Sequence, residues 1–448
     1  MAGRARFGSK LGLILSGVGS AVGLGNIWRF PQVTSSEGGA AFLFIYLPLV
    51  AFLSFPLILA EMSLGQKGQG SPFRTVKNVA GDKWGWVGGF LILATVLFMS
   101  YYTIIGGLTL KYAIFGAFQD ALTNPEPFLA ASNEGPSALL MHGVFTAIGV
   151  GIIAYGVSDG LEKANKIMMP ALFVIVIALA IYAVFQDGAG AGIDYYLSPD
   201  FSAIGLNTIQ VAIGQAFFST SVGFGIMLTF GSYMESGQSL IRSAGTIAVM
   251  DTFVAFTAGL MIFPLVFSQG LADQVIGTES LTDALYLTMP TAFGQISTGL
   301  VGYVFLIGFF GMVTMGALSS SISGLEVITS FMEEQWDISR WKGALLAAEL
   351  TFGLGIVSAL NSTMLGNVDT IVGNVMLVGG GLLVAILYGF AIDEPVKTLL
   401  GGEEDPGVWE ERITRYVSYI LRYVIPLALA AILIGNIPGT IDSLTWPF

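Results

Sequence analysis

Polar side chains that could bind an ion or a small solute stand inside long apolar stretches of this sequence. Asn26 and Arg29 follow a glycine cluster, Asp251 is isolated in the apolar run 242–270, and Asp369 lies near one end of the run 366–392. If such a run crosses a bilayer, a charge near its centre costs about 3 kcal/mol or more. Each charged residue of this set is therefore a functional candidate.

A serine-rich segment in the apolar run 297–332 adds hydroxyl groups. It contains Gly316, Ser319 and Ser320, followed by Ser321 and Ser323. Serine hydroxyls in helices often bond to a carbonyl of their own helix, so they are weaker evidence for a site than a charge is. By residue chemistry alone, Ser319 and Ser320 fit ion binding and local hydrogen bonding equally well.

Two glycine clusters form an internal repeat, because residues 20–25 (SAVGLG) and 220–225 (TSVGFG) match at a shift of 200 positions. Glycine inside a helix costs about 1 kcal/mol relative to alanine, so clustered glycines allow the helix to unwind. At mid-membrane, unwound backbone must face protein, water, ions or a substrate, because lipid offers no partner. One cluster alone would favour close packing of helices by small residues. Two clusters in equivalent places favour two broken helices.

The elements that must position these residues are membrane-spanning helices. Of the 448 residues, 54% are hydrophobic and 11% are charged, less than half the charged fraction of an ordinary globular protein. Eleven stretches approach or exceed the ~20 residues that a helix needs to cross the hydrocarbon. These spans, called helices 1 to 11 in this order, are 10–35, 40–66, 86–117, 139–157, 163–186, 206–234, 242–270, 297–332, 343–361, 366–392 and 415–437. The expected fold is therefore all-α and integral to the membrane.

The composition also excludes several kinds of chemistry. The chain has no cysteine, so disulfides, thiol catalysis and cysteine metal sites are excluded, and a single histidine excludes a histidine-rich metal centre. His142 lies at the edge of an apolar stretch and is interpreted as an ordinary helix-end histidine. Nothing indicates an enzyme or a nucleic-acid partner.

The distribution of basic residues predicts how the chain crosses the membrane. Alternating the spans from an inside N-terminus places nearly all lysines and arginines on one face and only Lys111 on the other. By the positive-inside rule, the N-terminus is cytoplasmic and the C-terminus is extracellular. The basic start followed by an apolar run superficially resembles a signal peptide, but the run continues through Trp28 to Pro31, which favours a retained first helix.

The repeat and the spans together predict a domain organisation. The second glycine cluster lies five spans after the first, and because five is odd the two halves have opposite orientations, as in secondary transporters. The expected organisation is one domain over residues 1–448, with a first repeat at 10–186, a second at 206–392 and a separate helix at 415–437.

The sequence resembles the neurotransmitter:sodium symporter family, which has the leucine-transporter fold. The most specific segment is residues 19–31 (GSAVGLGNIWRFP), and others are Tyr101-Tyr102, residues 215–219 (QAFFS) and the serine run near 319. The resemblance implies ten core helices in two inverted repeats of five, with helices 1 and 6 unwound. Helix 11 is peripheral, and the twelfth helix of many relatives is absent from this sequence.

The resemblance implies two sodium sites built from oxygen atoms. The first would use the Ala21 carbonyl, Asn26, Ser219 and Asp251 together with the substrate carboxylate. The second would use the carbonyls of Gly19, Val22 and Gly316 and the hydroxyls of Ser319 and Ser320. The family often has threonine where Ser219 and Ser319 stand, so the hydroxyl is kept and the methyl is lost.

The resemblance also implies a substrate site between the two breaks. The substrate carboxylate would meet the amides of Leu24 and Gly25 and the Tyr102 hydroxyl, next to Ala21. Gly23 stands where monoamine carriers have aspartate, which favours a free, neutral and apolar amino acid. The side-chain pocket would be bounded by Phe98, Phe218, Ser221, Phe224, Ser320 and Gly324, with Gly324 leaving room on helix 8.

Two gates and one hinge follow from the same resemblance. Arg29 and Asp369 would close the outer path by a direct or water-bridged ion pair, with Phe224 as a lid. On the inside, Arg4 would pair with Glu334 beside Tyr233. Helix 5 carries Gly160 and, after nine intervening residues, Pro170, and this segment would unwind to hydrate the second sodium site.

Asp251 further suggests that chloride is not required. Positions that resemble the halide site of animal members are Tyr46, Gln215, Ser219 and Ala255, and many chloride-independent relatives carry a carboxylate at the Ala255 position. Asp251 lies one helical turn earlier on the same face and would supply the missing negative charge. The resulting expectation is chloride-independent sodium symport by a monomer or weak homo-oligomer in the plasma membrane. An amino acid sensor on the same fold is the alternative, whereas the shortage of histidine and cysteine disfavours a membrane enzyme and two gates around one closed site disfavour a channel.

Overall fold

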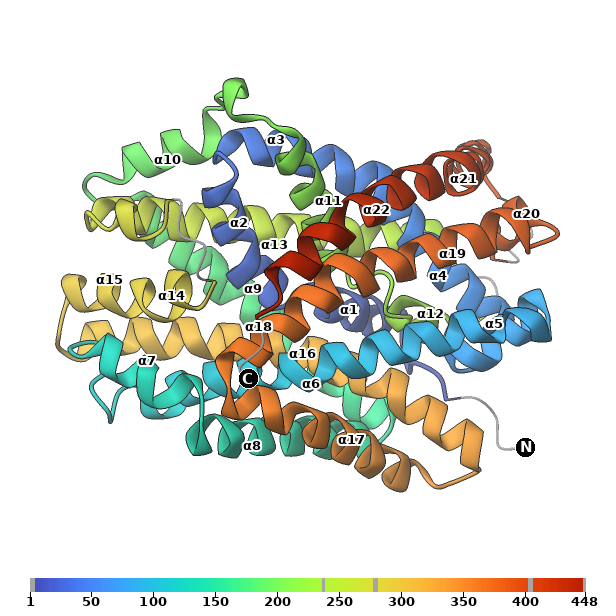
Figure 1. Ribbon diagram of the computed structural model, residues 1–448, viewed down its shortest axis with the longest axis horizontal. Coiled ribbons are helices and arrows are strands. Elements are labelled where there is room, and N and C mark those ends of the chain that lie inside the picture. Colours follow the sequence, from blue (N-terminus) through green and yellow to red (C-terminus); the bar gives the residue numbers. More distant parts are fainter. Residues whose placement is uncertain (1–4, 236–237, 277–280, 402–405, 446–448) are drawn as a thin grey trace.

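The computed structural model describes residues 5–235, 238–276, 281–401 and 406–445, and these residues form helices and turns with no β-strand. The long helices run side by side in one bundle, with α1 near its middle (Figure 1). Arg4, a predicted member of the inner gate, lies outside the described residues.

Nine helices in the described ranges are long and apolar enough to cross a membrane. Their bounds are Ala40–Gly68 (α3, η2 and α4), Asp82–Phe115 (η3 and α6), Pro136–Ala154 (α8), Val157–Val184 (η4 and α9), Leu240–Ser268 (α13), Leu300–Trp336 (α16), Arg340–Leu360 (α17), Ser362–Phe390 (α18, η7 and α19) and Val408–Ser443 (α21, η8 and α22). Each of them overlaps one of the predicted spans.

The first predicted span is a bent pair of helices. Helix α1 (Lys10–Ala21) begins after Ser9, whose hydroxyl accepts from the Gly12 N–H at 3.0 Å. The chain then leaves helical geometry at Val22 and resumes as η1 (Gly25–Arg29) and α2 (Phe30–Ser36). The two parts meet at an angle of 45°.

The sixth predicted span, 206–234, is not one long helix. It is divided into α11 (Leu206–Thr220) and α12 (Ile226–Gly231), and neither half is long enough to span a membrane alone. Between them Ser221, Gly223 and Gly225 have φ angles of 55°, 88° and 70°. Such left-handed backbone is available to glycine without strain, which explains two of these three positions. The predicted breaks at residues 20–25 and 220–225 are confirmed.

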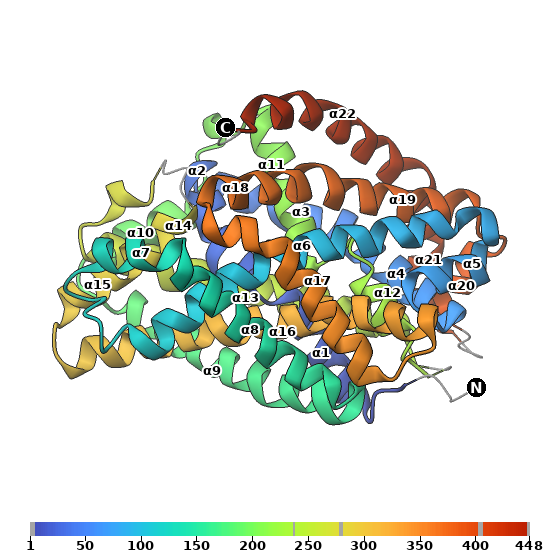
Figure 2. The same ribbon diagram turned by 60° about the horizontal axis from the view of Figure 1, so that its bottom comes forward.

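Shorter helices connect the spans at their ends. They are α5 (Pro72–Ala80), α7 (Pro125–Asn133), α10 (Ala189–Leu197), η5 (Phe201–Ala203), η6 (Ala272–Gln274), α14 (Leu281–Tyr286), α15 (Thr288–Ile296) and α20 (Pro395–Leu400). The last long helix packs along the outside of α19 in both views (Figures 1 and 2). Its place agrees with the predicted peripheral helix.

Glycines let the neighbours of the broken helix 6 approach its backbone. A Cβ atom added at Gly65 of α4 would lie 1.9 Å from the Leu228 oxygen, and one at Gly380 of α19 would lie 2.1 Å from the Gly223 oxygen. Both distances are far below van der Waals contact, so no larger residue fits without backbone movement. Helices 2 and 10 therefore hold the break by direct backbone contact.

Candidate functional site

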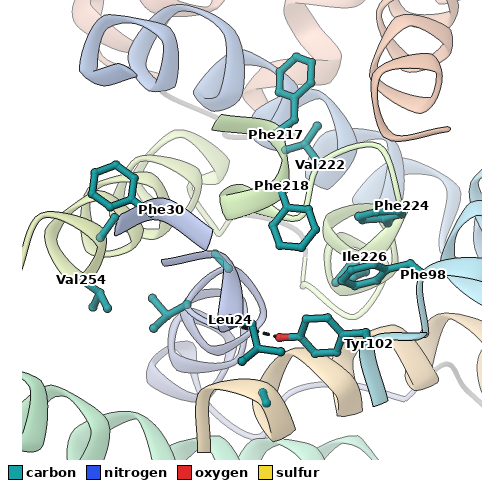
Figure 3. Packing of buried hydrophobic residues seen from close by; sticks show 14 of the residues in the cluster. Leu24, Phe30, Phe98, Tyr102, Phe217, Phe218, Val222, Phe224, Ile226 and Val254 are labelled. Carbon is teal, nitrogen blue, oxygen red and sulfur yellow. Dashed lines mark hydrogen bonds between the residues drawn. The ribbon is translucent and has the colours of Figure 1, made fainter. Parts of the chain in front are cut away.

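The two breaks face each other in the centre of the bundle. The Ser221 hydroxyl in the second break donates to the Ser20 carbonyl at the end of α1, at 2.9 Å. Helix α6 completes the site, because the Tyr102 hydroxyl accepts from the Leu24 N–H at 3.3 Å (Figure 3). Unpaired backbone groups of both breaks are thus met by side chains.

The residues predicted for the first sodium site converge in a fully buried cluster. The Asn26 amide donates to Asp251 Oδ1 at 2.7 Å and to Ser219 Oγ at 3.0 Å, and Ser219 Oγ lies 2.9 Å from Asp251 Oδ2. Asn26 Oδ1 accepts from the Gly23 N–H at 3.1 Å. Ala21 is the last residue of α1, so its carbonyl belongs to the helix end beside this cluster.

Asp251 has only neutral neighbours in this cluster. None of the ion pairs between described residues involves it. A buried carboxylate without a cation is expensive, since removing one partner of a buried ion pair typically costs 3–5 kcal/mol. A carboxylate, an amide oxygen and a hydroxyl are hard oxygen donors, and this set suits an alkali cation.

The residues predicted for the second sodium site also lie together. Ser319 Oγ donates to the Gly316 carbonyl of its own helix at 2.9 Å and lies 3.5 Å from the Val22 carbonyl. Ser320 Oγ reaches the carbonyls of residues 19 and 20 at 3.4 and 3.0 Å. The shorter bond of Ser319 is thus within its own helix, whereas Ser320 bonds to carbonyls of helix 1.

Aromatic rings form one wall between the breaks. Phe98 stacks on Phe224 with ring centroids 4.5 Å apart and meets Phe218 edge-on at 5.7 Å (Figure 3). A Cβ atom at Gly23 would lie 2.3 Å from Ser320 Oγ and 2.7 Å from the Tyr102 hydroxyl, so a larger residue would require these side chains to move. The wall is apolar and the backbone side is polar.

Gly324 does not leave free space in this structure. The Met99 side chain of α6 fills the room, since its Sδ lies 2.6 Å from the place of a Cβ atom at Gly324. Met99 was missed by the sequence reasoning, because only the tertiary structure shows which side chain fills the notch that a glycine leaves.

The predicted outer-gate residues are near the site but do not form a direct ion pair among the described residues. The Arg29 guanidinium lies over the Phe218 ring, 4.5 Å from its centroid. It also approaches Gly373, where an added Cβ atom would lie 3.7 Å from both terminal nitrogens. Gly373 is one helical turn beyond Asp369, so Arg29 faces the helix that carries Asp369.

The inner side contains a buried ionic cluster that the sequence reasoning missed. Glu326, which is fully buried in α16, accepts from Arg340 Nη2 and from the Tyr233 hydroxyl, both at 2.5 Å. Arg340 Nε also donates to the Ile153 carbonyl at 2.8 Å. Glu334 accepts from a backbone N–H, that of Ser71, at 2.9 Å. A carboxylate inside the predicted span 297–332 was the available signal for Glu326.

The predicted hinge of helix 5 has irregular geometry. Its first turn is a π-helix, η4 (Val157–Glu162), which contains Gly160, and α9 (Lys163–Val184) contains Pro170. A Cβ atom at Gly160 would lie 2.0 Å from the Ile152 oxygen at the end of α8. π-Helical turns are rare and occur frequently at functional sites.

Glu61 of α4 is a further residue that the sequence reasoning missed. Its carboxylate is fully buried and accepts from the N–H groups of Gly223 at 2.7 Å and Leu228 at 3.3 Å, on both sides of the second break. It thereby satisfies N–H groups that the interrupted helix leaves without partners. The signal was present, because Glu61 is the single acidic residue in the predicted span 40–66.

A helical membrane protein in which two spans break around oxygen-rich sites has the architecture of a secondary transporter. The family model described as "Sodium:neurotransmitter symporter family" matches residues 4–126 and 132–439. The chain belongs to the sodium:neurotransmitter symporter family.

Individual relatives agree with this assignment. The chain is 31% identical to the uncharacterized sodium-dependent transporter YhdH of Bacillus subtilis, covering 96% of this chain and 97% of the relative. It is 28% identical to a sodium-dependent transporter of Haemophilus influenzae, covering 97% and 98%. The crystal structure of MhsT in complex with L-phenylalanine superposes with a TM-score of 0.87 at 32% identity, covering 97% of this chain and 100% of that chain.

These findings confirm the coarse predictions. The protein is a multi-pass membrane protein with the leucine-transporter fold, and it is a sodium-coupled transporter of a small molecule rather than an enzyme.

We expect Glu61→Gln to destabilise the second break. A hydrogen bond to a charged group contributes about 1.5–3 kcal/mol, and the amide replaces one of the two accepting oxygens with a donor. The purified protein should unfold at a lower temperature and lose most of its stabilisation by sodium. Glu349→Gln, on the exposed side of α17, is the matched control and should change neither property. An unchanged melting temperature and sodium response of Glu61→Gln would show that another group holds the break.

Proposed function

We propose that this protein takes up a neutral, apolar amino acid together with sodium by alternating access. The observation that carries the proposal is the pair of facing breaks, which present backbone N–H and C=O groups beside the Asn26–Ser219–Asp251 cluster. An amino acid needs partners for both its carboxylate and its side chain. Leu24 and Tyr102 are the candidate partners for the carboxylate, and the ring wall of Phe98, Phe218 and Phe224 is the candidate contact for the side chain.

Two features support an uncharged substrate side chain. Gly23 presents no carboxylate to a substrate amine, and the Ser320 and Tyr102 hydroxyls occupy the space beside it. The related MhsT binds L-phenylalanine in its crystal structure. A substrate with an apolar side chain would replace contacts between the rings without leaving a buried charge unpaired.

Two sodium ions would bind on opposite sides of the first break. In the proposed cycle, sodium stabilises the outward-facing state, the substrate carboxylate completes the first site, and the Arg29–Asp369 gate then closes. Opening of the Arg4–Glu334 gate and unwinding of helix 5 near Gly160 and Pro170 would release the second sodium ion to the cytoplasm. The N-terminus would be cytoplasmic and the C-terminus extracellular in the plasma membrane, and the protein would act as a monomer or weak homo-oligomer.

A non-transporting amino acid sensor on the same fold is the alternative. Purified protein in liposomes should accumulate labelled neutral amino acids when sodium is high outside, and it should not do so with potassium in place of sodium. A panel that includes phenylalanine, leucine, alanine, lysine and glutamate identifies the substrate class. Sodium-dependent binding without accumulation would contradict transport and favour the sensor.

Tyr102→Phe tests the carboxylate position. The loss of a hydrogen bond to a charged group should weaken substrate binding about tenfold to a hundredfold, since such a bond contributes ~1.5–3 kcal/mol. Equilibrium binding of a labelled amino acid in saturating sodium gives the affinity. Tyr419→Phe is the control, because this side chain is exposed on α21, away from the two breaks. Equal affinities for the wild type and Tyr102→Phe would place the carboxylate elsewhere.

Asp251 is proposed to take the place of chloride. Two sodium ions and a zwitterionic substrate bring net positive charge into a buried site, and a nearby negative charge must balance it. Asp251 is next to Ser219, which also accepts from the Tyr46 hydroxyl at 3.3 Å. Gln215 donates to the Gly25 carbonyl at 2.8 Å, and Ala255 carries no charge that could serve instead.

Replacing chloride by gluconate should therefore leave wild-type uptake unchanged. Asp251→Asn removes the charge but keeps the shape, and its uptake should be lost in gluconate. The comparison uses initial rates of sodium-driven uptake in matched liposomes. The proposal is wrong if wild-type uptake collapses without chloride, or if Asp251→Asn stays fully active without it.

A further inference from the structure

The interface between helices 1 and 5 buries polar groups that have no partner. Asn165 of α9 is fully buried, and neither its oxygen nor its nitrogen has a hydrogen-bond partner among the described residues. The same is true of the Ser16 hydroxyl on α1. A buried polar group left without a partner costs about 1–3 kcal/mol, so this arrangement requires an explanation.

Asn165 is directly next to the proposed second sodium site. A Cβ atom at Gly19 would lie 2.7 Å from Asn165 Oδ1, so the amide oxygen rests in the notch of this glycine. The Gly19 carbonyl is one of the proposed ligands and lies 3.4 Å from Ser320 Oγ. Thus the unpartnered amide is on the helix 5 side of the ion-binding residues.

A second polar contact lies closer to the N-terminus on the same interface. Glu162, only 2% exposed, accepts from Gly8 N at 2.6 Å and Ser9 Oγ at 2.8 Å, and pairs with Lys166 at 2.6 Å. It occupies the notch of Gly12, where an added Cβ atom would lie 2.0 Å from Oε1. Glu162 therefore lies at the N-terminal end of α1.

Helix periodicity joins these two contacts into one row. Gly12, Ser16 and Gly19 are spaced by four and three residues, so they lie on one face of α1. Glu162 and Asn165 are likewise three residues apart on helix 5. The row therefore runs from the second sodium site past Asn165 and Ser16 to Glu162.

The chemistry of this row fits a cation in transit. It offers an amide oxygen, a hydroxyl and a carboxylate, and Pro170 leaves the Lys166 carbonyl without its usual N–H partner four residues on. Oxygen ligands of this kind suit sodium, and two neutral donors would hold it less tightly than the second site with its five oxygens. The adjoining π-helical turn, η4, allows this part of helix 5 to rearrange.

We propose that Asn165 and Ser16 form a relay site, which sodium occupies between the second site and Glu162 on its way to the cytoplasm. The proposal rests on the proposed function, because it assumes that the second site binds sodium. When helix 5 loosens, the Asn165 amide oxygen, which has no hydrogen-bond partner among the described residues, would bind the sodium ion. Asn165 is then a residue that controls release rather than equilibrium binding.

The test separates release from binding by using radioactive sodium as the probe. The full-length protein is loaded with it and diluted into sodium-free buffer, and release is followed with time. Asn165→Leu removes the oxygen but keeps the size, and it should slow release about tenfold while equilibrium sodium affinity stays within about twofold. Met169→Leu is the matched control, because Met169 Sδ rests in the same Gly19 notch, 3.2 Å from the added Cβ atom. It should release sodium at the wild-type rate.

A second measurement excludes a merely structural role. Net uptake of L-phenylalanine requires sodium release inside, whereas exchange with sodium on both sides does not. Asn165→Leu should slow net uptake and spare exchange, and Asn165→Ala should do the same if the leucine variant folds poorly. Wild-type sodium release in either variant overturns the relay site, as does an equal loss of uptake and exchange. Failure of the wild type to bind radioactive sodium would instead overturn the proposed function.

Discussion

Unpaired backbone at the centre of a membrane protein is the constraint on which the rest of this structure depends. Lipid cannot bond to an N–H or C=O group, and each group left alone costs several kcal/mol. The chain nevertheless interrupts two helices, at Val22 and at residues 221–225. Every neighbouring element therefore has to supply either a partner for these groups or a surface that keeps lipid away.

The partners come from four different helices. Glu61 of helix 2 accepts from both sides of the second break, and Tyr102 of helix 3 accepts from Leu24. Ser320 of helix 8 bonds to the end of α1, and Ser221 joins the two breaks directly. In this arrangement an ion or a substrate carboxylate can take the place of a side chain that now bonds to the backbone of a break. A site built in this way combines order with exchangeable ligands, which a transporter needs.

The two ends of the site are closed by different means. On the outer side the Arg29 guanidinium stacks over the Phe218 ring and forms no direct ion pair with Asp369 among the described residues. On the inner side the pair Glu326–Arg340 is buried and also holds Tyr233, and Glu162 ties the start of α1 to helix 5. Breaking a buried pair typically costs 3–5 kcal/mol. Opening the inner side therefore requires buried ionic contacts to break.

The sequence alone determined the membrane class, the spans and the places of both breaks, because apolar length and clustered glycines are local properties. Through the family resemblance it also predicted that Asn26, Ser219 and Asp251 belong to one site, and the three side chains lie together in the structure. It could not show that Glu61 caps a break 162 residues away, that Met99 fills the space beside Gly324, or that Asn165 faces Gly19 without a partner. Each of these depends on which helix faces which, and that is decided only when distant helices pack and their side chains compete for the same space.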